Sequence, residues 1–244
     1  MKKEKQSKSK SKSKKDKELL SQIPIWEKGY KDSDKLIIDF EKEKWRNAKA
    51  SFTDHDLKIF GYAVMEDWET SYMEELAKIS VSKAGEVLEL GYGMGISANF
   101  IQKGNITKHI IIEANHDVAK KARVFAKKAP HKTEILEGFW EEVIEKIPDN
   151  SLSGILFDTY PLTEKELYKN HFTFFPFAYK KLKKGGVFTY YSDEIKDFSK
   201  THVKKLKEAG FKLQNIKRKV VSVNPPKDCE YWKAKTILAP ILIK

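Results

Sequence analysis

Short β-rich runs alternate with helical patterns from residue 61 onward, and this alternation constrains the fold more than any other feature of the sequence. The β-rich runs cover residues 87–90, 110–112, 133–136, 155–157 and 187–191. The helical patterns cover residues 63–79, 97–102, 118–127, 140–147 and 164–182. Apolar strands separated by helices are typical of a parallel sheet covered on both faces. The sequence therefore predicts an α/β fold with a mostly parallel sheet.

The last part of the chain departs from this alternation. Residues 211–223 and 235–243 indicate two strands without a long helix between them, which predicts an antiparallel pair at one edge of the sheet. The chain has 244 residues, a length that fits one α/β domain with additions. We expect this domain over residues 61–244, preceded by an aromatic-rich lid segment over residues 19–60.

Residues 1–18 consist mainly of lysine and serine. This stretch contains nine lysines and three acidic residues, so it carries a charge of +6, which is half of the formal net charge of +12. A segment with almost no apolar residues cannot bury enough surface to become ordered, so the composition predicts a disordered tail. An arm that binds nucleic acid or an acidic membrane is the alternative. The stretch has no aromatic residue on which a base could stack, so nucleic acid is not the expected partner.

The overall composition excludes several classes of protein. Apolar residues make up 40% of the chain, which is enough for a core and excludes a wholly disordered protein. The single cysteine, Cys229, excludes an internal disulfide and a multi-cysteine zinc site, and the six histidines show no ligand spacing, so no metal is expected. The longest apolar stretch, residues 237–243, is interrupted by Pro240 and too short to span a bilayer. We therefore expect a cytoplasmic protein.

A glycine-rich turn follows the first predicted strand of the sheet. Gly91, Gly93 and Gly95 alternate with other residues, and Glu89 lies two residues before them, which gives the pattern ExGxGxG. Glycine permits a tight turn and the close approach of a ligand to the backbone. The pattern is neither a phosphate P-loop nor the GxGxxG of dinucleotide-binding proteins. An ordinary strand-to-helix turn is the alternative.

Two further features suggest an adenosine site beside this turn. Glu113 ends the next strand, 20 residues after Gly93, where a carboxylate can accept both hydroxyl groups of a ribose. Residues 137–141 follow the third strand and contain Trp140 and Glu141, an aromatic ring and an acid that suit an adenine and its amino group. A surface acid in the first case and core packing in the second are the alternatives.

Two other acidic residues indicate a site for a cation. Glu69 falls inside the apolar arc of the helix predicted over residues 63–79, and Asp158 closes the fourth strand of the sheet. A carboxylate inside an apolar arc needs a partner, because an unpaired buried charge is costly. Two carboxylates at one pocket suit a guanidinium, which binds carboxylates through paired hydrogen bonds. The alternatives are a core cation paired with Glu69 and a turn-forming or helix-capping role for Asp158.

These motifs resemble the class I S-adenosylmethionine-dependent methyltransferases. Within that group the chain is similar, from about Trp45 to its end, to the guanidinoacetate N-methyltransferase family, and arginine δ-N-methyltransferases share several of the same motifs. The matching stretches are residues 64–73, 90–96, 111–115, 154–162, 185–190 and 223–231.

The resemblance implies a role for each matching residue. Glu69 and Asp158 would hold the guanidino group and serve as the catalytic residues, and Asp158 would also reach the cofactor. Trp45 would be the aromatic lid residue beside cofactor and substrate, with Trp26 as a rival. The remaining S-adenosylmethionine-binding residues would be Met65, Met73, Tyr92, Gly93, Met94, Gly95, Ile96, Ser97, Glu113, Ala114, Asn115, Trp140 and Glu141.

The expected activity is therefore the N-methylation of a small guanidino compound, with guanidinoacetate, the precursor of creatine, as the first candidate. One stretch departs from the animal enzyme: residues 190–197 are shorter and acidic where backbone amides hold the substrate carboxylate in that enzyme. Arginine, free or in protein, is thus the alternative substrate, and Asp193 and Glu194 suit its α-ammonium group. A non-catalytic or nucleic-acid-associated module is a third interpretation. The sequence assigns no oligomeric state.

Overall fold

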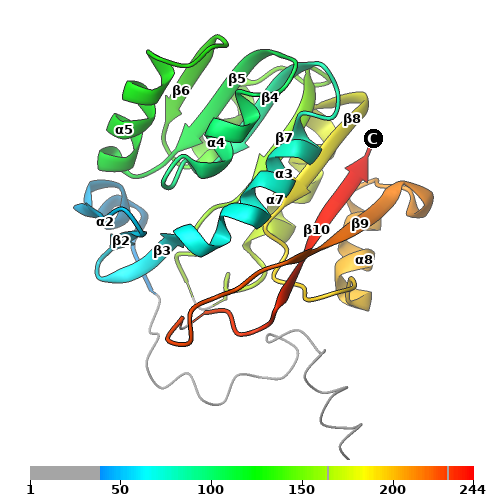
Figure 1. Ribbon diagram of the computed structural model, residues 1–244. Coiled ribbons are helices and arrows are strands. Elements are labelled where there is room, and N and C mark those ends of the chain that lie inside the picture. Colours follow the sequence, from blue (N-terminus) through cyan, green and yellow to red (C-terminus); the bar gives the residue numbers. More distant parts are fainter. Residues whose placement is uncertain (1–38, 164, 230) are drawn as a thin grey trace, which may run out of the picture.

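A seven-stranded sheet forms the centre of the molecule (Figure 1). The structure is a computed structural model and describes residues 39–163, 165–229 and 231–244. The strand order is β6-β5-β4-β7-β8-β10-β9. The strands are β4 Gly85–Leu90, β5 Ile106–Glu113, β6 Thr133–Glu137, β7 Leu152–Phe157, β8 Leu182–Tyr190, β9 Ile216–Ser222 and β10 Thr236–Ile243.

The direction of the strands agrees with the sequence pattern. Strands β6, β5, β4, β7 and β8 pair in parallel, whereas β10 pairs antiparallel with both β8 and β9. The predicted mostly parallel α/β sheet with an antiparallel pair at its edge is therefore confirmed.

Helices cover both faces of this sheet, because successive side chains of a strand point to opposite sides. Val87 of β4 belongs to one apolar core, which includes residues of α3, α4 and α5. Leu88 and Leu90 belong to the other core, which includes residues of α6, α7 and α8. The helices are α3 Thr70–Ser80, α4 Ile96–Ile101, α5 His116–Ala126, α6 Trp140–Val143, α7 Asn170–Lys181 and α8 Lys200–Glu208. The short 3-10 helices are η2 Asp67–Glu69, η3 Ile144–Lys146 and η4 Leu213–Asn215.

A second, three-stranded sheet precedes the large one. It consists of β1 Ala50–Phe52, β2 Asp56–Ile59 and β3 Tyr62–Glu66, and the helix α2 Lys42–Asn47 precedes it in the chain. All three strands pair antiparallel. Strands β2 and β3 belong to one hairpin, so this sheet crosses the boundary between the predicted lid segment and the predicted methyltransferase domain. Residues 1–38, which include the predicted tail and part of the predicted lid segment, lie outside the described residues.

The prediction of one helix over residues 63–79 was wrong in its first half. Residues 62–66 form β3, the next three form η2, and the α-helix begins only at Thr70. The cause is the hairpin turn, where Phe60 and Gly61 both have positive φ angles of 53° and 82° and bring β3 back along β2. The side chain of Met65 is therefore buried from a strand, opposite Leu57.

Two element boundaries and one whole helix also differ from the sequence prediction. Helix α7 begins at Asn170, because residues 165–169 form turns instead of continuing a helix from 164. Strand β9 begins at Ile216, after η4. Helix α8 was not predicted, since its run of lysines gives only a weak apolar pattern; the Ser199 side chain caps it by accepting from the His202 backbone N–H.

Candidate active site

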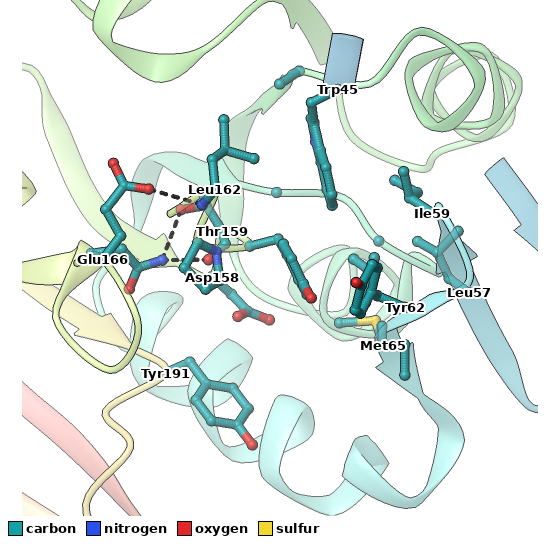
Figure 2. Close-up of a pocket in the computed structure, with 18 of the residues that line it drawn as sticks. Trp45, Leu57, Ile59, Tyr62, Met65, Asp158, Thr159, Leu162, Glu166 and Tyr191 are labelled. Atoms are coloured by element: carbon teal, nitrogen blue, oxygen red, sulfur yellow. Dashed lines mark hydrogen bonds between the residues drawn. The ribbon is translucent and has the colours of Figure 1, made fainter. Parts of the chain in front are cut away.

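A cavity of about 570 Å³ lies at the carboxyl ends of the parallel strands. Gly91, Glu113 and Asp158, which lie at or just beyond the ends of β4, β5 and β7, line one side of it. The small sheet contributes Leu57 and Met65 from another side. Figure 2 shows Trp45, Met65 and Asp158 around this space. Ligands of open parallel sheets bind at this edge, so the cavity is the candidate active site.

The glycine turn packs too closely against its neighbours to tolerate side chains. Gly91 has a φ of 86°, and a Cβ there would lie 2.0 Å from the Asp158 carbonyl oxygen. Gly93 has a φ of 54°, and its Cβ would lie 2.8 Å from the Met65 sulfur. Both glycines line the cavity, so their backbone is open to a ligand on the other side.

Glu113 lies beside this turn and keeps acceptor capacity toward the cavity. It is 8% exposed and lines the cavity. Its Oε2 accepts from the Tyr92 backbone N–H at 2.9 Å and its Oε1 accepts from the Asn115 backbone N–H at 2.8 Å. Burial raises the pKa of Glu113, and these backbone hydrogen bonds oppose that rise. Each carboxylate oxygen can accept a further hydrogen bond, so a ribose diol fits this carboxylate.

The structure brings about half of the predicted cofactor residues to the cavity wall. Those that line it are Trp45, Met65, Gly93, Glu113, Ala114, Trp140, Glu141 and Asp158. The others do not line it: Met73, Tyr92, Met94, Gly95, Ile96, Ser97 and Asn115. Several of these shape the wall from behind. The Ser97 hydroxyl donates to the buried Glu89, and the Met94 backbone N–H points at the Met65 sulfur at 3.3 Å.

Asn115 connects two elements that border the cavity. Its side-chain oxygen accepts from the Asp117 and Val118 backbone N–H groups and thereby caps α5. Its Nδ2 donates to the Trp45 carbonyl at 2.9 Å and to the Ala48 carbonyl at 2.8 Å. The buried amide thus holds α2 against the end of β5, although it does not face the cavity.

Trp45 packs at the cavity wall. Its side chain is buried and stacks on Tyr160, with ring centroids 4.8 Å apart. The rival lid residue, Trp26, lies outside the described residues.

Glu69 is buried without a cationic partner. Its side chain lines the cavity, is 3% exposed, and accepts from the Glu66 backbone N–H at 3.2 Å. No lysine or arginine of the described residues pairs with it, so the core cation considered from the sequence is not found in this part of the chain. Burial, followed by the negative charge of Asp158, raises the pKa of Glu69 to about 8.

The backbone of Asp158 is held in place by a hydrogen bond, but its carboxylate has no hydrogen-bond partner among the described residues. Its backbone N–H donates to the Leu90 carbonyl at 2.9 Å, which fixes the residue just beyond β7. Its carboxylate accepts no hydrogen bond from residues 39–163, 165–229 or 231–244, and the residue does not cap a helix in this part of the chain. Burial, followed by the charge of Glu89, raises the pKa of Asp158 to about 7.

The cavity contains residues that the sequence analysis did not identify as site residues. Tyr191 and Tyr231 line it, and their hydroxyl groups are buried. The negative charge of Glu69 contributes to the raised pKa of both. Tyr191 follows β8 directly, so its position at the carboxyl edge was a usable signal. Tyr231 lies between β9 and β10, where only the fold brings it to the cavity.

The two acidic residues that follow β8, Asp193 and Glu194, lie in different surroundings. Asp193 lines the cavity. Glu194 does not; its Oε1 accepts from the Ser199 backbone N–H and lies 3.1 Å from the His202 Nδ1.

Comparisons with known proteins show which family the chain resembles. A family model described as guanidinoacetate N-methyltransferase matches residues 39–244. Protein arginine N-methyltransferase 2 of Kluyveromyces lactis is 35% identical over 136 residues, which cover 53% of this chain and 32% of the yeast protein. The protein of the same name from Candida glabrata is 32% identical over 170 residues, or 66% of this chain and 40% of that protein. The chain thus spans well under half the length of these relatives.

Solved structures share the fold. Spermidine synthase from Thermotoga maritima superposes with a TM-score of 0.56 at 18% identity, covering 81% of this chain and 72% of the synthase. A spermidine synthase in complex with the transition-state analogue AdoDATO superposes with a TM-score of 0.55 at 18% identity, with the same coverage of both chains.

The family match covers all but the first 38 residues and therefore includes every described residue of the cavity lining. The glycine turn and the carboxylate of Glu113 fit S-adenosylmethionine, which is the cofactor of this chain. The chain belongs to the guanidinoacetate N-methyltransferase family.

Proposed function

We propose that the protein transfers the methyl group of S-adenosylmethionine to a nitrogen of a guanidino group. The observation that carries the proposal is that Glu69 and Asp158 face one cavity beside the glycine turn, and neither has a cationic partner in the described part of the chain. A guanidinium supplies the missing positive charge and matches carboxylates through paired hydrogen bonds.

The cofactor would be held by the residues already at the wall. Gly91 and Gly93 would offer close backbone contact, Glu113 would accept the ribose hydroxyl groups, and Trp140 would pack near the base. When bound, S-adenosylmethionine supplies a methyl group that is activated by its positively charged sulfur. Glu141, proposed for the adenine amino group, also pairs with Lys42, since its Oε1 lies 3.0 Å from the lysine nitrogen.

Glu69 and Asp158 would have different duties toward the substrate. Both would localise positive charge on the guanidino nitrogens that do not react, which leaves the lone pair of the third nitrogen available. That nitrogen loses a proton as it is methylated, and a carboxylate with a pKa near neutral is suited to accept it. We assign this proton to Asp158, because Glu69 is the more deeply buried of the two and would chiefly hold the cation.

Two substrates remain candidates. Guanidinoacetate is favoured by the family model over residues 39–244. Arginine, free or in a peptide, is favoured by the named relatives and by the acidic residue Asp193 in the cavity. The proposal favours a small-molecule substrate.

The proposal also includes a cytoplasmic location, which the single free cysteine Cys229 favours. None of the helices in the described part of the chain has the length and hydrophobicity needed to cross a bilayer.

The test is a substrate panel. The full chain is incubated with S-adenosylmethionine and, separately, with guanidinoacetate, arginine and an arginine-containing peptide, and S-adenosylhomocysteine and the methylated product are quantified by mass spectrometry. Methylation of at least one compound on a guanidino nitrogen supports the proposal. Cofactor binding without methylation of any guanidino compound contradicts it.

A further inference from the structure

Asp193 is a further acidic side chain at the cavity. It lies three residues after the end of β8, lines the same cavity as Glu69 and Asp158, and is 18% exposed. Its φ is 56°, in the left-handed region. Within the described residues, its carboxylate accepts no hydrogen bond and pairs with no lysine or arginine. Burial, followed by the charges of Asp158 and Glu194, raises its pKa to about 8.

No positive group of the described residues neutralises this carboxylate. The nearest ring nitrogen belongs to His171, whose Nδ1 lies 4.0 Å from the Asp193 Oδ2. Burial lowers the pKa of His171 well below its ordinary value, so this imidazole is neutral. His171 is therefore not the counter-ion of Asp193.

The cations at the cavity wall are already engaged. Within the described lining, the only lysines or arginines are Lys42 and Lys58. The Lys42 nitrogen lies 3.0 Å from a Glu141 oxygen, and the Lys58 nitrogen lies 2.7 Å from an Asp56 oxygen. Both lysines are therefore paired in this structure, and neither is paired with Asp193.

A guanidinium bound by Glu69 and Asp158 therefore leaves Asp193 without a positive partner among the described residues. We propose that Asp193 selects the substrate by binding a second positive group, an ammonium, on a guanidino compound, and that it disfavours a compound that carries only a carboxylate there. This inference rests on the proposed function. In this inference Asp193 determines which guanidino compound binds, whereas Glu69 and Asp158 take part in the methyl transfer.

The test uses three guanidino compounds of matched length: agmatine, which ends in an ammonium, butylguanidine, which ends in a methyl group, and 4-guanidinobutanoate, which ends in a carboxylate. Values of kcat/KM are measured for the wild type and for Asp193→Asn. Asparagine is nearly isosteric and is among the residues that tolerate a positive φ, so this substitution removes the charge and keeps the backbone. The control is Asp197→Asn, which removes the same charge from the same segment, outside the cavity, where Asp197 pairs with Arg218.

The wild type is expected to prefer agmatine over butylguanidine by about tenfold or more, the factor that a charge-assisted hydrogen bond supplies. It is expected to use 4-guanidinobutanoate least. Asp193→Asn should reduce the preference for agmatine to about twofold or less and leave butylguanidine within about threefold of the wild-type value, because the hydrogen bond to the ammonium is lost and the guanidinium site is not. Asp197→Asn should keep the wild-type order.

Two outcomes overturn the inference. One is an equal loss for all three compounds in Asp193→Asn, which would place this carboxylate at the guanidinium or in the fold. The other is a wild-type preference for the carboxylate-bearing compound.

Calorimetry of the same compounds in the presence of S-adenosylhomocysteine separates this inference from the proposed function. Binding that prefers agmatine through Asp193, without any methylation, supports the inference and contradicts the proposed function. Methylation without that preference does the reverse. The absence of both binding and turnover contradicts both.

Discussion

Glu69 and Asp158 have the same charge but different expected effects on catalysis. Asp158→Asn keeps the shape of the side chain and removes the proton acceptor, so we expect kcat to fall by about 100-fold or more, with a smaller effect on cofactor affinity. Glu69→Gln removes a charged hydrogen bond to the substrate, worth roughly 1.5–3 kcal/mol, and should mainly raise KM. Steady-state kinetics on the best compound of the panel measure both. Glu74→Gln, at a partly exposed residue of α3 that pairs with Lys78, is the control and should have wild-type kinetics. Near wild-type rates in both site variants would make the two acids structural.

The raised pKa of Glu69 also predicts how the stability of the ligand-free protein depends on pH. The folded protein holds this proton up to about pH 8, whereas the unfolded chain releases it near the ordinary value of 4.5. The native state thus binds more protons than the unfolded state between these values, so the free energy of unfolding falls as pH rises through this window. Glu69→Gln removes the titration, and its melting temperature should exceed that of the wild type by more at pH 9 than at pH 5. A constant difference across this range would show that Glu69 is charged at all of these pH values.

At the scale of elements, the sequence predicted the large sheet because each parallel strand is an apolar run bounded by polar or glycine-rich turns. It did not predict β3, because the apolar residues between Ala63 and Trp68 fit a helical period as well as a strand, and only pairing with β2 decides between them. The sequence did not predict α8, because this lysine-rich helix buries only a few side chains, among them Leu206.

In the site, strand-end acids such as Glu113 and Asp158 could be placed from the sequence. Tyr231 could not, because its position depends on how the β9–β10 connection folds back.

Asn115 links two elements, and its removal should affect both. Asn115→Ala deletes the cap of α5 and two hydrogen bonds to carbonyl groups of the segment that carries Trp45. A lost cap costs about 1 kcal/mol, and carbonyl groups left without partners add a similar amount, so we expect a destabilisation of about 2 kcal/mol. Because Trp45 lines the cavity, cofactor or substrate affinity should weaken as well.

The matched control for this variant is Ser199→Ala, which removes the cap of α8. It should lower the free energy of unfolding and leave the ligand affinities unchanged, because Ser199 does not line the cavity. Chemical denaturation and calorimetry measure the two quantities. Unchanged ligand binding in Asn115→Ala would show that α2 keeps its position without this amide.

At the scale of the whole molecule, the basic tail and the methyltransferase part should be separable. The family match begins at residue 39, and the described lining of the cavity begins at Lys42. Deleting residues 1–18 removes +6 of the formal charge of +12 without removing any of these residues. At 0.15 M salt the Debye length is about 8 Å, so charges outside the cavity act weakly on a substrate inside it. We therefore expect kcat/KM of the shortened chain to stay within about twofold of the full chain, and its melting temperature to stay within about 2 °C.

Replacing the nine lysines of residues 1–18 by glutamine in the full-length chain separates the effect of charge from the effect of length. A drop in kcat beyond severalfold in the deletion, but not in the glutamine variant, would mean that the tail contacts the site through its backbone or serines.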